Sequence, residues 1–186
     1  MRRAITFIGA LALVAGFAGC GDDAVCGPPE GADPDGIGAT TPGGPVTWGD
    51  FDSSPNNDCG MQSLSVHGFQ ATPVLAGGIT PPITLCIPQP SAIGADPITP
   101  GFTDDDTVRL VDFAGGDAED CTFTVDRDVA LAMTVAFTGF CDDGANAAGY
   151  GISLAGSVAV KRDCAGTITD ATVQLSGTAP VSPAPL

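Results

Sequence analysis

Hydrophobic and polar residues alternate along two long stretches of the chain, residues 129–138 and 152–161. Every second residue in these stretches is mostly Val, Leu, Ile, Met or Phe, and the residues between them are mostly Ala, Ser and Thr. A period of two places successive side chains on opposite faces of an extended strand. Both stretches are therefore predicted to be β-strands with one buried face.

Shorter segments of the same kind surround them, at residues 62–67, 82–87, 107–113, 121–125 and 172–177. Turn-forming residues separate the later segments, at 126–128, 142–144 and 162–166. No segment after residue 20 keeps the 3.6-residue period of an amphipathic helix. The sequence thus predicts an all-β domain.

Short turns join the segments from residue 121 onward, and such turns favour an antiparallel meander. With the earlier strands added, we expect an antiparallel β-sandwich, with a small β-barrel as the alternative. In this arrangement residues 126–128 form a hairpin turn. Cys121 and Cys141 then lie about 27 Å apart along the paired strands, so they are not expected to bond to each other.

The first twenty residues have the pattern of a secretory signal peptide. Arg2 and Arg3 give a positively charged start, and an apolar stretch follows over residues 4–17. This stretch is shorter than the ~20 residues that a transmembrane helix needs. It fits the apolar region of a signal peptide, which forms a helix before it is removed.

The apolar stretch leads into Phe17-Ala18-Gly19-Cys20, which resembles the lipobox of bacterial lipoproteins. The resemblance implies cleavage after Gly19 and a diacylglyceryl group on the Cys20 thiol, usually with a third acyl chain on its amine. Two or more acyl chains anchor a protein stably to a membrane. We therefore expect a protein of the bacterial cell envelope, on the outer membrane and facing the periplasm or the cell surface.

Composition divides the rest of the chain. Residues 20–46 are rich in Gly and Pro and are predicted to be a flexible tether after the signal peptide of residues 1–19. Residues 47–178 hold the predicted strands and form the expected domain. Residues 179–186 contain three prolines and are predicted to be a disordered tail.

Six cysteines remain once Cys20 is assigned to the lipid. An even number in an exported chain predicts three disulfides, whose pairing the sequence leaves open. The spacing gives no C-x-x-C pair and no zinc-ligand pattern. The six residues are Cys26, Cys59, Cys86, Cys121, Cys141 and Cys164.

The chain is strongly acidic, with 22 Asp and Glu against 6 Lys and Arg, a formal charge of −16. Loss of Arg2 and Arg3 with the signal peptide brings that charge to −18. Such a chain repels phosphate backbones, so nucleic acid is excluded as a partner. The expected partner is the membrane, through the lipid anchor, with a protein or glycan partner left open.

One segment has the oxygen-rich spacing of a calcium loop. Its side-chain oxygens recur at every second position, at Asp50, Asp52, Ser54, Asn56 and Asp58. Pro55 and Met61 stand where an EF-hand needs Gly and Glu, so only a looser Ca²⁺ site is compatible with this spacing. Turn chemistry alone is the favoured explanation, and no cofactor is expected unless this segment binds Ca²⁺.

The sequence contains no recognisable catalytic motif. His67 is the one histidine, and its phase places it on the polar side of a strand with Ser63 and Ser65. There is no G-x-S-x-G nucleophile motif. The proline-rich stretch of residues 88–106 is either a binding loop or a stiffened connector.

These observations predict a non-catalytic structural or interaction domain on a lipid tether. A calcium-dependent adhesion or carbohydrate-binding module is the alternative. A hydrolase with an unrecognised site is the third possibility.

Overall fold

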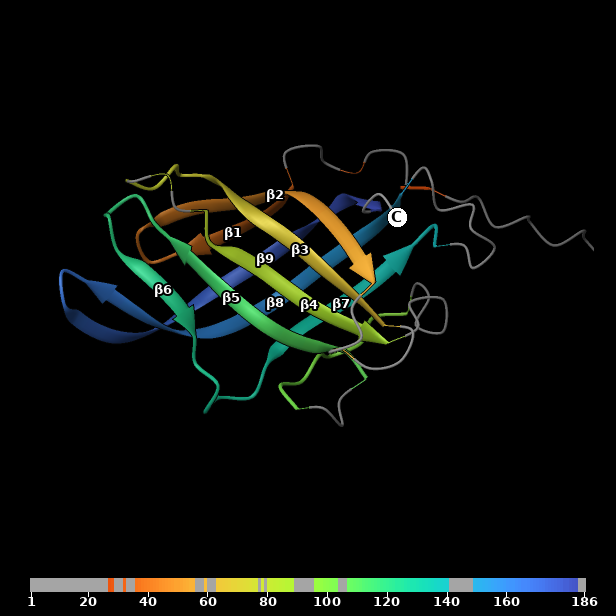
Figure 1. The fold of residues 1–186 in the computed structure, drawn as a ribbon. Coiled ribbons are helices and arrows are strands. Elements are labelled where there is room, and N and C mark those ends of the chain that lie inside the picture. The colour runs from red at the N-terminus through yellow and green to blue at the C-terminus, as the bar shows by residue number, and fades with distance from the viewer. Residues whose placement is uncertain are drawn as a thin grey trace, which may run out of the picture.

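A computed structural model gives the fold, and it describes residues 27–28, 32, 36–55, 59, 63–76, 78, 80–88, 96–103, 107–140 and 149–183. These residues form nine β-strands in one continuous sheet (Figure 1). No helix among them is long and apolar enough to cross a membrane. The strands are β1 (Ile37–Thr41), β2 (Gly44–Pro55), β3 (Ser63–Thr72), β4 (Pro82–Pro88), β5 (Arg109–Gly116), β6 (Thr122–Val125), β7 (Ala132–Thr138), β8 (Tyr150–Cys164) and β9 (Thr167–Pro183).

The sheet closes on itself into an eight-stranded antiparallel barrel, with β7 as an additional strand. The order around the barrel is β1, β2, β3, β4, β5, β6, β8 and β9, and β9 returns to β1. β2 also pairs directly with β9. Residues 51–53 of β2 run parallel to residues 181–183 of β9. The all-β prediction is confirmed, and the barrel replaces the expected sandwich because the last strand pairs with the first two.

β6 and β7 both pair with β8, but at different ends of it. β6 pairs with residues 160–163 and β7 with residues 151–157. The predicted hairpin at 126–128 is therefore wrong: this turn leads the chain along one side of β8 instead of folding β7 back onto β6. Only β7, β8 and β9 form the meander that the sequence suggested.

The described part of the proline-rich stretch, residues 96–103, lies between β5 and β7. Ile98 exchanges backbone hydrogen bonds of 2.8 Å with Val135 of β7. Gly101 pairs with Arg109 of β5. The described residues 96–103 therefore bridge β5 and β7 through backbone hydrogen bonds, and a binding role for this stretch stays a prediction.

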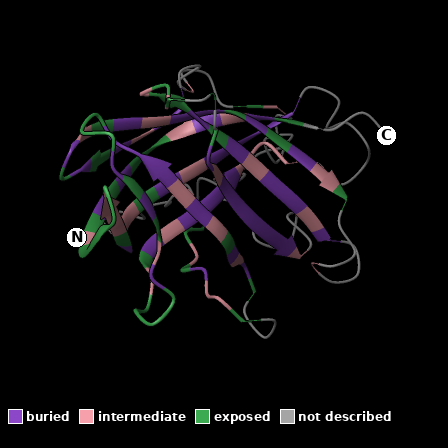
Figure 2. Cartoon of the chain, turned by 60° about the vertical axis from the view of Figure 1, so that its left-hand side comes forward, coloured by how far each residue is buried: buried purple, intermediate pink, exposed green. Residues whose placement is uncertain are grey.

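Large apolar side chains pack the barrel interior. Trp48, Phe113 and Phe123 are each at most 2% exposed, and their ring centroids lie 5.4–6.2 Å apart. Burial alternates along parts of β1, β2 and β9, whereas β4 is buried from Ile83 to Ile87 (Figure 2 shows burial by colour). The ring of Phe51 fills the space beside Gly68, where a Cβ atom would collide with it. Alternating burial is what the period of two in the sequence predicts.

Both predicted ends of the domain need correction. β1 and the start of β2 lie inside residues 20–46, the predicted tether, and Ile37 and Val46 are fully buried. β9 runs into residues 179–186, the predicted tail, and Val181 is buried opposite Phe51. The Gly and Pro content of these segments led to the prediction of flexible chain. Pro is nevertheless tolerated in a strand at positions where pairing does not require a backbone N–H. The signal peptide at 1–19 lies outside the described residues.

Two disulfides are present among the described residues. Cys59 bonds to Cys86, and Cys121 bonds to Cys164. The expectation that Cys121 does not pair with Cys141 is thus confirmed. Cys20, Cys26 and Cys141 lie outside the described residues.

Candidate binding groove

A groove of about 460 Å³ lies between the segment that follows β3 and the β5–β6 hairpin. Its lining is mostly apolar, with one exposed carboxylate, that of Asp120. Concave apolar surfaces with few polar groups are where proteins most often bind other molecules. The lining residues are Leu75, Ala76, Pro81, Pro82, Ala114, Gly115, Asp120, Cys121, Thr122, Phe123 and Thr124.

The buried side chain of Gln70 fixes one wall of the groove. Its amide nitrogen donates to the carbonyl oxygens of Pro73, at 2.8 Å, and Gly116, at 2.9 Å. Its amide oxygen accepts a hydrogen bond of 2.7 Å from the backbone N–H of Gly116. One side chain thereby holds the segment after β3 against the end of β5. Leu75 then covers Gly116, where a side chain would have no room.

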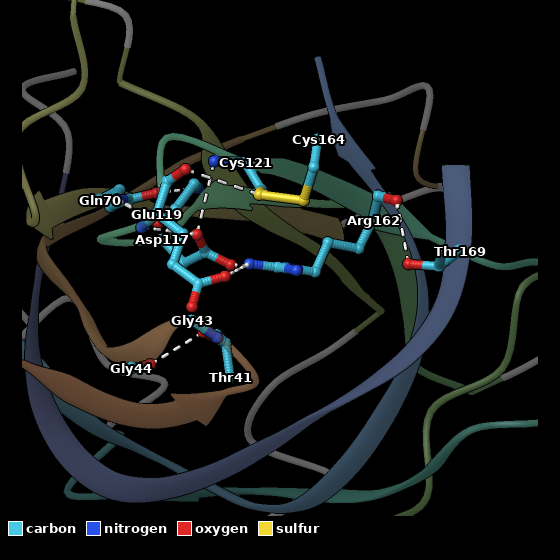
Figure 3. Close-up of polar contacts among 11 residues, drawn as sticks. Thr41, Gly43, Gly44, Gln70, Asp117, Glu119, Cys121, Arg162, Cys164 and Thr169 are labelled. Carbon is cyan, nitrogen blue, oxygen red and sulfur yellow. Dashed lines mark hydrogen bonds and ion pairs between the residues drawn. A yellow bond between two sulfur atoms is a disulfide. The ribbon is translucent and has the colours of Figure 1, made fainter. Parts of the chain in front are cut away.

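An ion pair fixes the opposite wall. The β5–β6 turn carries Asp117, whose side chain is fully buried and accepts a hydrogen bond of 2.7 Å from Nε of Arg162 on β8. A second nitrogen of Arg162 donates to the Glu119 carboxylate at 2.6 Å. Figure 3 shows both acids converging on the guanidinium, beside the disulfide between Cys121 and Cys164. β8 therefore holds this turn by two charge-assisted contacts and one covalent bond.

The environment of Asp117 keeps it ionised. Burial acts to raise the pKa of this carboxyl. The hydrogen bond from Arg162, those from the backbone N–H groups of Glu119 and Cys121, and the positive charge of Arg162 act the other way. Together they outweigh burial and hold the pKa of Asp117 below its ordinary value. The pair also holds the pKa of Arg162 well above its ordinary value, so both charges persist at neutral pH.

The same residues give the one group of possible metal ligands among the described residues, Asp117, Glu119 and Cys121. The Cys121 sulfur, however, is bonded to Cys164 and is no thiolate ligand. Both carboxylates already face the guanidinium of Arg162. The two carboxylates of this cluster are therefore partners of the Arg162 guanidinium.

The residues predicted to form a calcium loop lie on a strand instead. Asp50 and Asp52 are exposed and Ser54 is half-buried, all on β2. β2 is irregular here, with a register shift between Gly49 and Asp52 and a φ of 49° at Asp50. Asn56 and Asp58 lie outside the described residues. Asp50, Asp52 and Ser54 therefore belong to a strand and not to a loop, and calcium binding by this segment stays a prediction.

His67 shares one face of β3 with Ser63 and Ser65, but both serines are buried and His67 is half-buried. Its Nδ1 atom is 3.2 Å from Oγ1 of Thr84 on β4. Thr84 is buried, so its hydroxyl is not presented to a substrate. The contact serves to join two neighbouring strands.

Comparison with protein-family models, with characterised proteins and with solved structures finds no match to this chain.

Proposed function

We propose that this chain is an exported lipoprotein, anchored through Cys20, whose barrel is a non-catalytic binding module that uses the groove. The lipobox-like end of the signal peptide supports the anchor. The groove supports the binding role, and it is the observation on which that role rests. The carboxylates of Asp117 and Glu119 beside it are both engaged by Arg162, so they position the wall instead of performing chemistry.

Shape and charge define what the groove accepts. Its lining of Leu, Ala, Pro and Phe favours an apolar group, since burying apolar surface contributes about 25 cal/mol per Å². The carboxylate of Asp120 at the groove and the formal charge of −18 after processing disfavour anions. We therefore propose an apolar, neutral or cationic group as the occupant.

The chain contains its own reporter for this groove. Trp48 is the single tryptophan, and its indole N–H donates to the carbonyl oxygen of Ala114 at 3.3 Å. Ala114 lines the groove, so an occupant that shifts it changes the surroundings of the indole. Titration with N-phenyl-1-naphthylamine, a neutral apolar dye, should enhance dye emission and shift the Trp48 emission at the same saturating concentration.

A groove-filling variant and a matched control make the test specific. Thr124 is exposed on β6 and lines the groove, so Thr124→Phe should fill it and abolish saturable dye binding. Thr40 is an exposed threonine on β1 outside the groove, and Thr40→Phe should bind the dye like the parent chain. Absence of saturable binding to the parent chain, or equal binding to both variants, would contradict the proposal.

A further inference from the structure

Residues 167–173 of β9 form a stretch of strand edge that has a described partner on one side only. That partner is β8. β1 pairs with β9 further along, at residues 174–176, and β2 pairs with it at residues 181–183. In Figure 1 this end of the β8–β9 hairpin projects from the barrel beside β6. Its edge is a row of backbone donors and acceptors that face outward.

The hairpin turn determines which backbone groups face that edge. Cys164 and Thr167 flank a two-residue turn, in which Ala165 and Gly166 have φ values of 52° and 88°. Two positive φ values identify a type I′ turn, and the residues flanking such a turn hydrogen-bond to each other. Hydrogen-bonded and non-hydrogen-bonded pairs then alternate along the ladder. The N–H and C=O groups of Ile168, Asp170 and Thr172 therefore point away from β8.

Apart from the charge of Asp170, this edge lacks the features with which proteins usually block strand addition. Its sequence holds no proline and no lysine, and the β8–β9 register runs without a bulge. The side chains of the same three residues are exposed on the outer face, Ile168 at 65%. An added strand would therefore meet an apolar, an acidic and a hydroxyl side chain in alternation.

The charge beside the edge selects the partner. Lys161 of β8 lies between two carboxylates, 2.9 Å from that of Asp126 and 2.6 Å from that of Asp170. One negative charge is left over, and the Asp170 side chain is 84% exposed. A second copy of this chain would bring a formal charge of −16 or more against the same charge, with acidic edges facing each other. A basic segment is attracted instead.

We propose that residues 167–173 of β9 receive an extended, basic segment of a partner protein as an additional strand, with a Lys or Arg beside Asp170. Main-chain hydrogen bonds to Ile168, Asp170 and Thr172 supply affinity, and the side chains supply the preference. The inference shares with the proposed function only the premise that this domain binds other molecules. The edge and the groove are separate surfaces, so a negative result at one of them does not affect the proposal for the other.

The test is an amide NMR titration of the full chain in detergent with the capped peptide Thr-Val-Lys-Val-Thr-Val. The amides of Ile168, Asp170 and Thr172 should shift with saturation, while those of the groove residues Ala114 and Thr124 should not. The same peptide with Glu in place of Lys should bind about fivefold more weakly, because like charges across a strand pair are unfavourable.

A proline variant removes one edge donor without touching the β8–β9 ladder. Thr172→Pro should abolish the peptide shifts, and Thr172→Val, which keeps the donor, should retain them. Ile168→Pro provides a second such variant if the first perturbs the spectrum elsewhere. The inference is overturned if the peptide gives no saturable shift, or if the shifts map to the groove. It is also overturned if the Glu peptide binds equally well, or if the folded proline variants still bind. Concentration-dependent edge shifts without peptide would assign the edge to a second copy and overturn it too.

Discussion

Gly43 lies directly against the carboxylate of Asp117, so a side chain at position 43 would occupy the space of that carboxylate. The two residues belong to different hairpin turns, β1–β2 and β5–β6, which meet at one end of the barrel (Figure 3). Arg162 reaches the same carboxylate from β8. Three separate parts of the chain thus meet around one buried charge.

Gly43→Ala is therefore expected to destabilise the fold. The added methyl group pushes the Asp117 carboxylate away from Arg162, and disrupting a buried ion pair costs about 3 kcal/mol. Denaturant unfolding measures this loss. Gly38→Ala on β1 is the matched control, because a Cβ atom there meets Ser176 at an ordinary contact distance of 3.6 Å. A loss below about 0.5 kcal/mol for Gly43→Ala, the usual effect of a neutral surface substitution, would show that the turns do not depend on this contact.

The stabilisation from Asp117 should depend on pH in a defined direction. Its pKa is lowered in the folded state, so its contribution is complete above the ordinary aspartate pKa of about 4 and is lost as the pH falls through the lowered value. Asp117→Asn should lower the melting temperature at pH 7. The difference from the parent chain should shrink below about pH 4.

Asp120→Asn controls for loss of an acidic charge in the same turn, since Asp120 is exposed. Melting temperatures of the three proteins between pH 2 and about pH 8 give the comparison. A difference between Asp117→Asn and the parent chain that stays constant across that range would mean that the carboxylate does not contribute through its ionisation.

The local alternation of hydrophobic residues predicted the strands better than it predicted how they close into a barrel. Residues 152–161 alternate cleanly and lie within β8, because one face of that strand packs in the core. The barrel depends on pairings such as Gly38 with Ser176, which no local period encodes. β1 was missed because it has only five residues and is flanked by turn-forming residues, with Gly36 before it and Pro42 and Gly43 after it.

The groove was harder to predict than the strands. Gln70 shares the inward phase of Val66 and Gly68, and Arg162 shares that of Val158 and Val160. A polar residue in an apolar phase was the available signal for both. Asp117 gave no such signal, because it sits in a turn among 22 acidic residues. Its role follows only from the distance to Arg162.

The remaining cysteines are expected to pair with each other. The backbone N–H of Gly27 donates to the carbonyl oxygen of Gly139 at 2.9 Å. Cys26 and Cys141 are one and two residues away from these glycines, at about 3.4 Å per residue, so their Cα atoms can approach within the ~7 Å that a disulfide requires. Peptide mapping under non-reducing conditions should recover a Cys26–Cys141 link beside the two observed disulfides. Alkylation of either cysteine in the unfolded, unreduced protein would contradict this pairing.

Anchoring through Cys20 is tested most directly by the intact mass of the protein extracted from membranes. We predict a mass that exceeds that of the polypeptide Cys20–Leu186 by a diacylglyceryl group or more, and loss of this addition in Cys20→Ser. An unmodified mass for Cys20–Leu186, or a precursor that retains residues 1–19, would contradict the lipoprotein assignment.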